Sequence, residues 1–156
     1  MQNLFHWIIP DRVLASRYPD TIDDLATLRN CGVRVIINLT ERRHNADALR
    51  SLEMSEVHLP VPDFTAPPPL TLDAAIASIT AAHAQDQAVA IHCMGGLGRT
   101  GTVVAAWLVT QRLDSDAAIE RVRTVRPGSI ETESQEQAVR DFAIRHARNR
   151  PTTESS

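Results

Sequence analysis

Short apolar, β-branched runs alternate with helix-like segments along this chain, and that alternation limits its possible folds more than any other feature. The runs at residues 33–39 and 88–92 are largely apolar at consecutive positions, which is typical of strands buried on both faces of a parallel sheet. Helix-like segments lie between these runs, as crossover connections require. The pattern therefore predicts an α/β fold with a mainly parallel central sheet flanked by helices on both faces.

Helix caps and turn residues place the remaining elements. Thr21 is expected to cap a helix that ends before Gly32, Thr71 to cap a long alanine-rich helix, and Ser115 or Asp114 to cap a later one. No repeat and no internal linker is evident, so one domain is expected. Strands are expected at residues 5–9, 12–16, 33–39, 57–59 and 88–92, and helices at residues 22–30, 45–53, 71–85, 100–111, 115–125 and 133–148.

The length of 156 residues fits one hydrophobic core, which we place in a single domain at residues 1–150. The polar residues 151–156 are expected to form a disordered tail. No apolar run approaches the roughly 18 residues of a membrane span. The first residues also lack the basic region and apolar stretch of a secretory signal. We therefore expect a soluble, cytoplasmic monomer that does not contact a membrane.

Composition excludes several classes of function. The net charge of −3 argues against a general nucleic-acid binder. All 16 basic residues are arginine, so the chain has no lysine for a Schiff base or for a nucleotide-binding P-loop. The two cysteines, Cys31 and Cys93, are too few for a disulfide framework or a thiolate zinc site. The histidines show no metal-ligand spacing, and we expect no metal and no cofactor.

Residues 91–101, Ile-His-Cys-Met-Gly-Gly-Leu-Gly-Arg-Thr-Gly, are the most informative stretch of the chain. They follow a predicted buried strand and precede a predicted helix, which is where active sites of open α/β sheets collect. The glycines let the backbone curl so that its N–H groups face inward and form an anion nest. The following helix adds the positive end of its dipole. The expected phosphate-binding residues are Met94, Gly95, Gly96, Leu97, Gly98 and Arg99.

A cysteine at the start of such a loop is suited to nucleophilic catalysis. Helix N-termini and neighbouring cations lower the pKa of a thiol from about 8.5 to roughly 3.5–7.5, which makes the thiolate available at neutral pH. Arg99 can hold two phosphate oxygens with its planar fork of donors. The hydroxyl of Thr100 is expected beside the sulfur of Cys93, where it stabilises the departing thiolate. A structural cysteine before a glycine-rich turn is the alternative.

These residues resemble the protein tyrosine phosphatase signature HCxxGxxR[ST], and the Gly-Arg-Thr-Gly ending resembles the dual-specificity branch. Similarity to the small atypical dual-specificity phosphatases of the VHZ type extends through residues 5–10, 38–42, 62–64 and 126–132. The resemblance implies a compact α/β catalytic domain with the cysteine-dependent phosphatase fold. It also implies catalysis without a metal, in two steps through a phosphocysteine intermediate.

A proton donor for the leaving group is also expected, because water is a poor acid for an alkoxide or phenoxide. Asp63 lies on a proline-rich loop after a predicted strand, about 30 residues before Cys93, as the general acid of the family does. The alternative is a solvated turn aspartate. Glu131 either positions the hydrolytic water and assists proton transfer, or is a helix-entry carboxylate stabilised by the helix dipole.

Other residues are given supporting roles. His92 is expected to order the loop through hydrogen bonds, and Asn38 to bond to the same loop from the end of the other buried strand. Cys31 is interpreted as an inert residue at a helix end, with redox pairing to Cys93 as the alternative. Phe64 and Arg42 are placed at the substrate rim, although Phe64 is equally compatible with a core position and Arg42 with a solvated surface.

The expected substrate is a phosphorylated protein or peptide carrying phosphotyrosine, with phosphoserine and phosphothreonine as further substrates. No extended segment is available to build a deep cleft, which favours a shallow, permissive pocket. Phosphoinositides or other small phosphate esters are the first alternative, although the neutral residues between the cysteine and arginine of the loop disfavour them. A non-catalytic module that binds phosphorylated partners, and sulfur transfer on a related cysteine loop, are the others.

Overall fold

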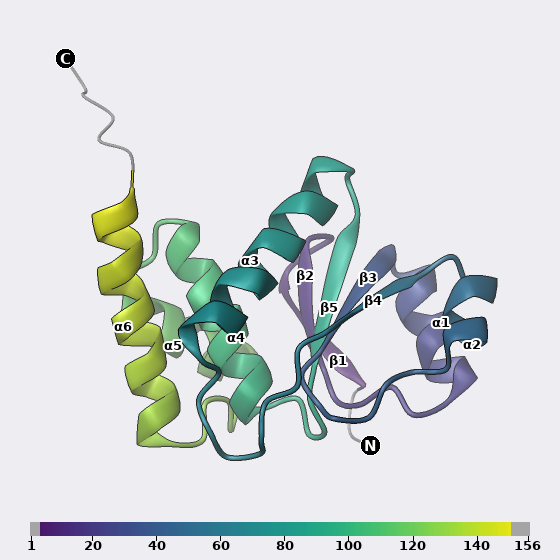
Figure 1. Ribbon diagram of the computed structural model, residues 1–156, viewed down its shortest axis with the longest axis horizontal. Helices are drawn as coiled ribbons and strands as arrows, with labels where there is room; N and C mark the ends of the chain where they lie inside the picture. Colours follow the sequence, from purple (N-terminus) through teal and green to yellow (C-terminus); the bar gives the residue numbers. More distant parts are fainter. Residues whose placement is uncertain (1–3, 151–156) are drawn as a thin grey trace.

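A five-stranded sheet with the strand order β1-β2-β5-β3-β4 forms the centre of the computed structural model, which describes residues 4–150 (Figure 1). Only β1 and β2 pair antiparallel; the other three pairs are parallel. The predicted polar tail at 151–156 lies outside the described residues. The strands are β1 (Phe5–Ile9), β2 (Val13–Ser16), β3 (Val33–Asn38), β4 (Ser55–His58) and β5 (Ala88–His92).

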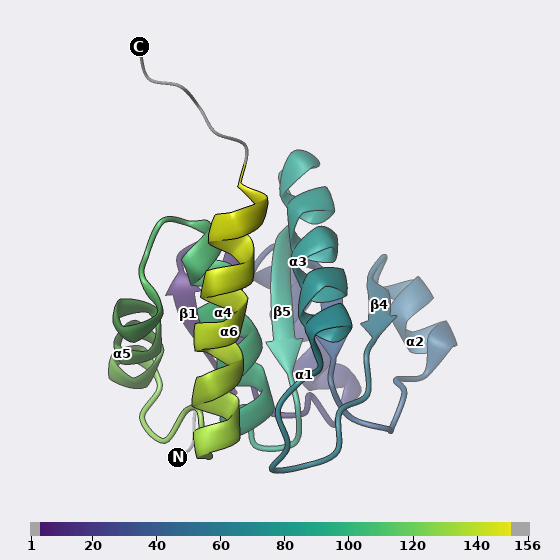
Figure 2. The same cartoon turned by 60° about the vertical axis from the view of Figure 1, so that its left-hand side comes forward.

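Helices cover both faces of this sheet, as the sequence predicts. Two short helices, α1 and α2, lie against one face, and the other four lie on the opposite face (Figures 1 and 2). None of the helices within residues 4–150 is both long and apolar enough to cross a membrane. The helices are α1 (Ile22–Asn30), α2 (Ala46–Ser51), α3 (Pro69–Ala84), α4 (Gly98–Thr110), α5 (Ser115–Val125) and α6 (Glu133–Asn149).

The hydrophobic core has two parts, one on each side of the sheet. The larger part joins β5 and β3 to α3, α4 and α6, and α4 is buried along nearly its whole length. The smaller part joins the other face to α1 and α2 through Leu14, Leu28, Ile36 and Leu49. All five residues of β5 are buried, because β5 is the central strand and both of its faces are covered. Because burial of these side chains holds β5 in place, it also fixes where the loop at 93–99 begins.

The register of the parallel strands brings three loops to one edge of the sheet. His92 at the end of β5 pairs with Ser16 on one side and with Asn38 on the other. The segments after β2, β3 and β5 therefore begin side by side, and the loop between β4 and α3 lies at the same edge (Figure 2). The signature loop at 93–99 and the proline-rich loop are brought together by this alignment.

Several predicted boundaries need correction. The helix predicted to begin after Thr71 starts at Pro69, because a proline at the first helical position has the required φ and needs no N–H partner. The helix predicted from Thr100 begins at Gly98, so it starts closer to Cys93. Asp114, not Ser115, is the cap of α5. The cap at Thr21 is confirmed, since its hydroxyl accepts the Asp24 amide at 3.0 Å.

Candidate active site

The loop at 93–99 is held from outside through its carbonyl groups. The Met94 carbonyl accepts the Tyr18 amide at 2.8 Å, and the Leu97 carbonyl accepts the Ile130 amide at 3.2 Å. His92 Nδ1 lies 3.1 Å from the Cys93 carbonyl oxygen. Because C=O and N–H point in opposite directions across a trans peptide, carbonyls that face outward turn the following amides inward. The loop therefore presents N–H groups to its own centre, as an anion nest requires.

Arg126, at the end of α5, holds two further carbonyls of this loop. Its Nε donates to the Gly96 carbonyl at 2.8 Å and its Nη2 to the Gly95 carbonyl at 3.1 Å. Its Nη1 contacts Nδ1 of His6 at 2.7 Å, so that ring nitrogen accepts. Burial, with Arg126 as a second cause, lowers the pKa of His6 and favours the neutral ring that can accept. Arg126 was assigned no role from the sequence, although it lies in the segment 126–132 that resembles the family.

Gly96 is the position in the loop where only glycine fits. Its φ is +74°, in the left-handed region that disfavours other residues. A Cβ at this position would also collide with the backbone carbonyl of Ser16 and approach Arg126 Nη2 to 2.8 Å. The glycine therefore permits both the curl of the loop and its close approach to β2.

The sulfur of Cys93 lies at the start of α4 and is almost completely buried, with 3% of the residue exposed. The hydroxyl of Thr100, which is fully buried, donates to Sγ at 3.0 Å. A helix N-terminus and a hydroxyl donor both favour negative charge on this sulfur. The structure thus brings the two residues together as the sequence analysis expected.

Arg99 extends from the first turn of α4 and is 5% exposed. Its Nη1 donates to the Val61 carbonyl at 2.9 Å, and its Nη2 lies 3.4 Å from Oδ1 of Asp63. Its Nε is a buried donor with no hydrogen-bond acceptor among residues 4–150. Buried donors without an acceptor are rare because they cost free energy. The guanidinium therefore joins the loop to the proline-rich segment and keeps one donor for another acceptor.

The segment around Asp63 is a tight turn that exposes an aromatic ring. Thr65 donates to the Pro62 carbonyl through its amide at 3.2 Å and its hydroxyl at 2.6 Å. Oδ1 of Asp63 accepts the Phe64 amide at 2.8 Å, and Phe64 has a φ of +61°. Phe64 is 61% exposed, so the core position considered for it is wrong. A large residue in this left-handed conformation is uncommon, and residues strained in this way cluster at functional sites.

A buried glutamine ties this turn to the start of α6. Gln135 Oε1 accepts the amides of Glu131 at 2.7 Å and Thr132 at 3.2 Å, while its Nε2 donates to the Thr65 carbonyl at 3.1 Å. A Cβ on Gly98 would collide with the Glu131 carboxylate, so Glu131 lies against the end of the loop. Gln135 was not predicted from the sequence. Its position three residues after Thr132, as in a capping box, was the available clue.

Asn38 does not bond to the signature loop, which corrects the expectation made for it. Its Oδ1 accepts the Thr40 amide at 2.9 Å, and its Nδ2 donates to the Arg42 carbonyl and to Glu56 Oε2, both at 2.8 Å. The Asn38 side chain therefore holds the turn at residues 40–42, which directly follows β3. Arg42 pairs with Asp20 at 2.9 Å at this exposed edge.

His92 is fully buried behind Cys93. Desolvation by burial, with smaller contributions from His44 and Arg99, lowers the pKa of His92 to about 3, so its ring is neutral. The expectation that this residue supports the loop agrees with its contact to the Cys93 carbonyl. Cys31, the other cysteine, is the C-cap of α1 and forms no disulfide.

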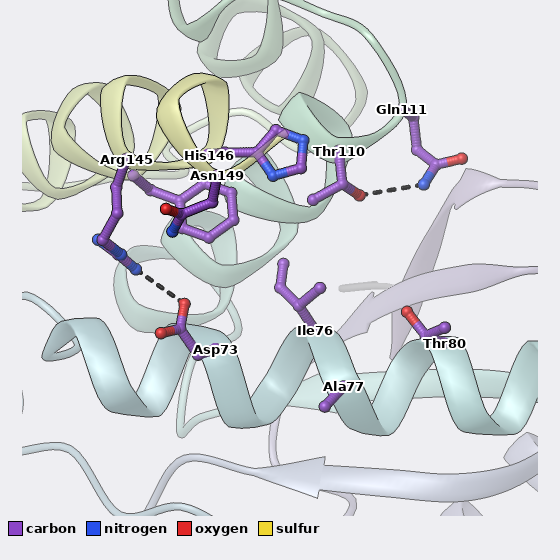
Figure 3. A pocket seen from close by; sticks show the side chains of 10 residues that line it. Asp73, Ile76, Ala77, Thr80, Thr110, Gln111, Arg145, His146 and Asn149 are labelled. Atoms are coloured by element: carbon purple, nitrogen blue, oxygen red, sulfur yellow. Dashed lines mark hydrogen bonds and ion pairs between the residues drawn. The ribbon is translucent and has the colours of Figure 1, made fainter. Parts of the chain in front are cut away.

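Two hollows of about 470 Å³ each open on the surface. One is lined by Met94, Gly95 and Leu97 of the loop and by Arg17 and Arg126. The other lies between α3 and α6 and contains an ion pair between Arg145 and Asp73 at 2.8 Å (Figure 3). None of the residues that line the second hollow belongs to the Cys93 loop, and no cysteine is among them.

Comparison with known proteins relates this geometry to a family. The family model PTP-SAK, described as "Swiss Army Knife protein, DSP-PTPase phosphatase domain", matches residues 2–139. A protein tyrosine phosphatase domain-containing protein 1 from Danio rerio is 32% identical over 170 aligned positions, which cover 92% of this chain. The match covers 23% of that relative, so the chain corresponds to less than a quarter of its length.

Solved structures show the same arrangement of elements. A crystal structure of Tk-PTP in the active form is 33% identical, with a TM-score of 0.84, and the match covers 93% of this chain and 99% of that one. A crystal structure of PTPMT1 in complex with PI(5)P is 20% identical, with a TM-score of 0.85, over 94% of this chain and 98% of that one. At this lower identity the likeness to PTPMT1 shows a shared fold.

Proposed function

This chain belongs to the dual-specificity branch of the protein tyrosine phosphatase superfamily, and on that premise we propose that it hydrolyses phosphate monoesters on proteins. Phosphotyrosine is the main proposed substrate, with phosphoserine and phosphothreonine as further ones. The coarser assignment, a phosphatase domain that uses cysteine-based catalysis, follows from family membership. The residue roles and the substrate class are proposals drawn from the geometry.

In the first proposed step, Cys93 Sγ attacks the phosphorus of the bound ester. The S–P bond forms as the P–O bond to the alcohol or phenol breaks, and Asp63 gives its proton to the departing oxygen. The inward amides of the loop and the Arg99 guanidinium hold the phosphoryl oxygens as negative charge redistributes among them.

In the second step, water attacks the phosphorus of the phosphocysteine. Asp63, now ionised, accepts a proton from that water, and Glu131 orients it from its place beside Gly98. The S–P bond breaks, and the hydroxyl of Thr100 stabilises the thiolate that leaves. Inorganic phosphate is released and Cys93 returns to its starting state, so the cycle needs no metal or cofactor.

The observation that carries this proposal is the pairing of a sulfur and a free guanidinium donor around one loop. Thr100 donates to Cys93 Sγ at 3.0 Å, and Arg99 Nε is buried without an acceptor among the described residues. A phosphoryl oxygen bound in the loop would accept from that nitrogen. The 3.4 Å contact between Arg99 and Asp63 supports placing the acid beside the same phosphoryl group.

The exposed ring of Phe64 supports the preference for phosphotyrosine. It follows directly after the proposed acid and is turned into solvent by its left-handed backbone, where it can stack on a phenyl ring. Met94 and Leu97, which flank the loop glycines, carry no charge that would bind additional phosphates. Both features favour an aryl phosphate on a protein over a multiply phosphorylated headgroup.

A phosphoinositide or another small phosphate ester is the second candidate substrate. The shared fold with PTPMT1, whose structure contains PI(5)P, supports this candidate. Arg17 also lines the hollow beside Met94, Gly95 and Leu97 and places a cation next to the loop. Parallel assays of phosphate release from phosphotyrosine peptides and from the seven phosphoinositides would decide between the two. A preference for any phosphoinositide by tenfold or more in kcat/KM would overturn the protein-substrate proposal.

The proposed chemistry is tested by hydrolysis of para-nitrophenyl phosphate without added metal, with and without vanadate. Cys93→Ser should abolish turnover, whereas the matched variant Cys31→Ser should retain it. An acid-quenched reaction should yield a phosphoryl group on the Cys93 peptide. Binding of phosphopeptides without turnover in the wild type would favour the non-catalytic module instead. Sulfur transfer would be indicated by a persulfide on Cys93 after incubation with thiosulfate, together with no phosphate release.

The role of Asp63 is tested with aryl phosphates whose leaving groups differ in basicity. Asp63→Asn should slow esters of basic phenols about 100-fold or more and esters of acidic phenols much less, because only the former need a proton. Asp73→Asn, which changes a carboxylate on α3 that pairs with Arg145, is the matched control. Equal slowing of all esters by Asp63→Asn would exclude it as the acid.

A further inference from the structure

Two histidine rings meet behind the catalytic loop. His44 Nε2 and His92 Nε2 are 2.8 Å apart, and the ring centroids are 4.9 Å apart at an interplanar angle of 77°. His92 is fully buried, and its other ring nitrogen, Nδ1, lies 3.1 Å from the Cys93 carbonyl oxygen. Three groups are thus joined in a line: one imidazole, a second imidazole, and the first peptide of the loop.

The positions of the protons in this line follow from what each atom can accept. A carbonyl oxygen only accepts, so His92 Nδ1 carries the hydrogen. Burial lowers the pKa of His92 to about 3 and also lowers the pKa of His44, so each ring is neutral at neutral pH and has a single N–H. His92 Nε2 is then a lone pair, and His44 Nε2 must be the donor. The contact fixes the tautomer of both rings.

The surroundings of His44 hold its ring in this position. Its amide donates to Glu56 Oε2 at 3.1 Å, and the same oxygen accepts from Asn38 Nδ2 at 2.8 Å. The ring of Tyr18 lies against both imidazoles, with centroid distances of 4.8 Å to His44 and 4.9 Å to His92. Asn38, which does not reach the signature loop itself, therefore acts on the turn that places His44.

The consequence reaches the inside of the loop. If His92 adopted the other tautomer, its Nδ1 lone pair would face the Cys93 carbonyl oxygen, and the two would repel. The carbonyl would lose the donor that holds it outward. Because the peptide between Cys93 and Met94 is trans, the Met94 amide points opposite to that carbonyl and into the nest. The Met94 amide is thus aligned by the N–H of His44, which acts through the ring of His92.

We propose that His44 is a positioning residue for catalysis: its Nε2–H fixes the tautomer of His92, which holds the Cys93–Met94 peptide so that its amide faces the thiolate and the bound phosphoryl group. His44 lies in a separate turn after β3, so this role is distinct from that of His92, the residue that precedes the nucleophile. The effect of His44 on catalysis rests on the proposed function, whereas its effect on the tautomer of His92 can be observed without turnover.

The test compares two substitutions that differ in one donor. His44→Phe keeps an aromatic ring beside Tyr18 and removes the N–H, whereas His44→Gln places an amide N–H near the former Nε2. We expect His44→Phe to lower kcat/KM for para-nitrophenyl phosphate about tenfold and to slow iodoacetamide alkylation of Cys93 at pH 7 by a similar factor. His44→Gln should restore both to within about twofold of wild type. His146→Phe, on α6 beside the hollow in Figure 3, is the matched control for loss of a half-buried histidine.

Nitrogen-15 NMR of the histidine rings provides a readout independent of activity. Wild type should show His92 with hydrogen on Nδ1 and a lone pair on Nε2, and His44→Phe should change that pattern while His44→Gln retains it. Wild-type activity and alkylation in His44→Phe, or equal loss in both variants, would overturn the proposal. Should His44→Phe fail to fold, hydrogen on Nε2 of His92 in the wild type would overturn it alone. A correct tautomer in a protein without phosphatase activity would refute the proposed function and leave this assignment standing.

Discussion

Replacing Arg126 by methionine tests whether the active-site loop is shaped from outside. The change keeps most of the apolar stem and removes three donors, two of which hold the carbonyls of Gly95 and Gly96 at 3.1 and 2.8 Å. Each hydrogen bond from a charged donor contributes about 1.5–3 kcal/mol. The two therefore contribute about 3–6 kcal/mol, from which the cost of burying the guanidinium is subtracted.

The burial of Arg126 shows that this desolvation cost is present. Arg126 is 6% exposed, and burial lowers its pKa, which shows that desolvation opposes the charged form. The variant regains this desolvation free energy but leaves two carbonyls of the loop without their donors. We expect a net loss of about 2–4 kcal/mol in the free energy of unfolding, or an equivalent local loosening of the loop.

Activity should fall more clearly than stability, because the loop is the part that loses its support. A loosening of about 3 kcal/mol corresponds to roughly a 100-fold fall in kcat/KM for para-nitrophenyl phosphate, since each 1.36 kcal/mol is tenfold. Urea unfolding followed by circular dichroism gives the stability change at a constant m-value. Arg121→Met removes one positive charge from an exposed position on the same helix and should alter neither quantity. Activity within twofold of wild type in folded Arg126→Met would refute the reasoning.

Three further predictions address single side chains. Thr100→Val should slow hydrolysis of the phosphocysteine about 10–100-fold, because it removes the 3.0 Å hydrogen bond to Cys93 Sγ. Rapid-quench kinetics should then show an initial burst of product that wild type lacks. Equal slowing of the formation and the hydrolysis of the phosphocysteine would contradict this. Phe64→Leu should raise KM for phosphotyrosine peptides about three- to tenfold and leave phosphoserine peptides unaffected, as peptide kinetics would show; equal effects would contradict a stacking role. The pKa of His92 is 6.5 in the unfolded chain and about 3 in the folded protein, so between these pH values only the unfolded state binds the proton. The free energy of unfolding should therefore fall as the pH falls from 6.5 to 3, with His92 contributing about 1.4 kcal/mol per pH unit. His92→Asn should remove that contribution in urea titrations from pH 4 to 7, and an unchanged slope would contradict the neutral buried ring.

The elements nearest the catalytic loop could be predicted from the sequence because local rules determine them. The run at 88–92 is apolar throughout, and β5 has those bounds. The glycines and arginine that follow specify an anion loop, and comparison with known proteins confirms the predicted family and fold. Thr21 caps α1 through a contact with the amide three residues later, as its position before the helix predicted.

The residues that support the loop could not be predicted in the same way. Arg126 contacts carbonyls about 30 positions earlier, and Gln135 reaches the Thr65 carbonyl from α6, so both contacts depend on how α4, α5 and α6 pack. The prediction for Asn38 was wrong for a related reason. Asn38 does end the buried strand β3, where it pairs with His92, but its side chain turns toward its own loop rather than across the sheet.

The central proposal is that the loop activates Cys93 as a nucleophile, and the most direct measurement is the rate of iodoacetamide alkylation at each cysteine at pH 7. Cys31, at the end of α1 and half-buried, serves as the reference thiol in the same molecule. Mass spectrometry should show Cys93 reacting faster than Cys31 at pH 7, and inorganic phosphate should protect Cys93 and not Cys31. Equal rates for the two cysteines, without protection by phosphate, would contradict the account.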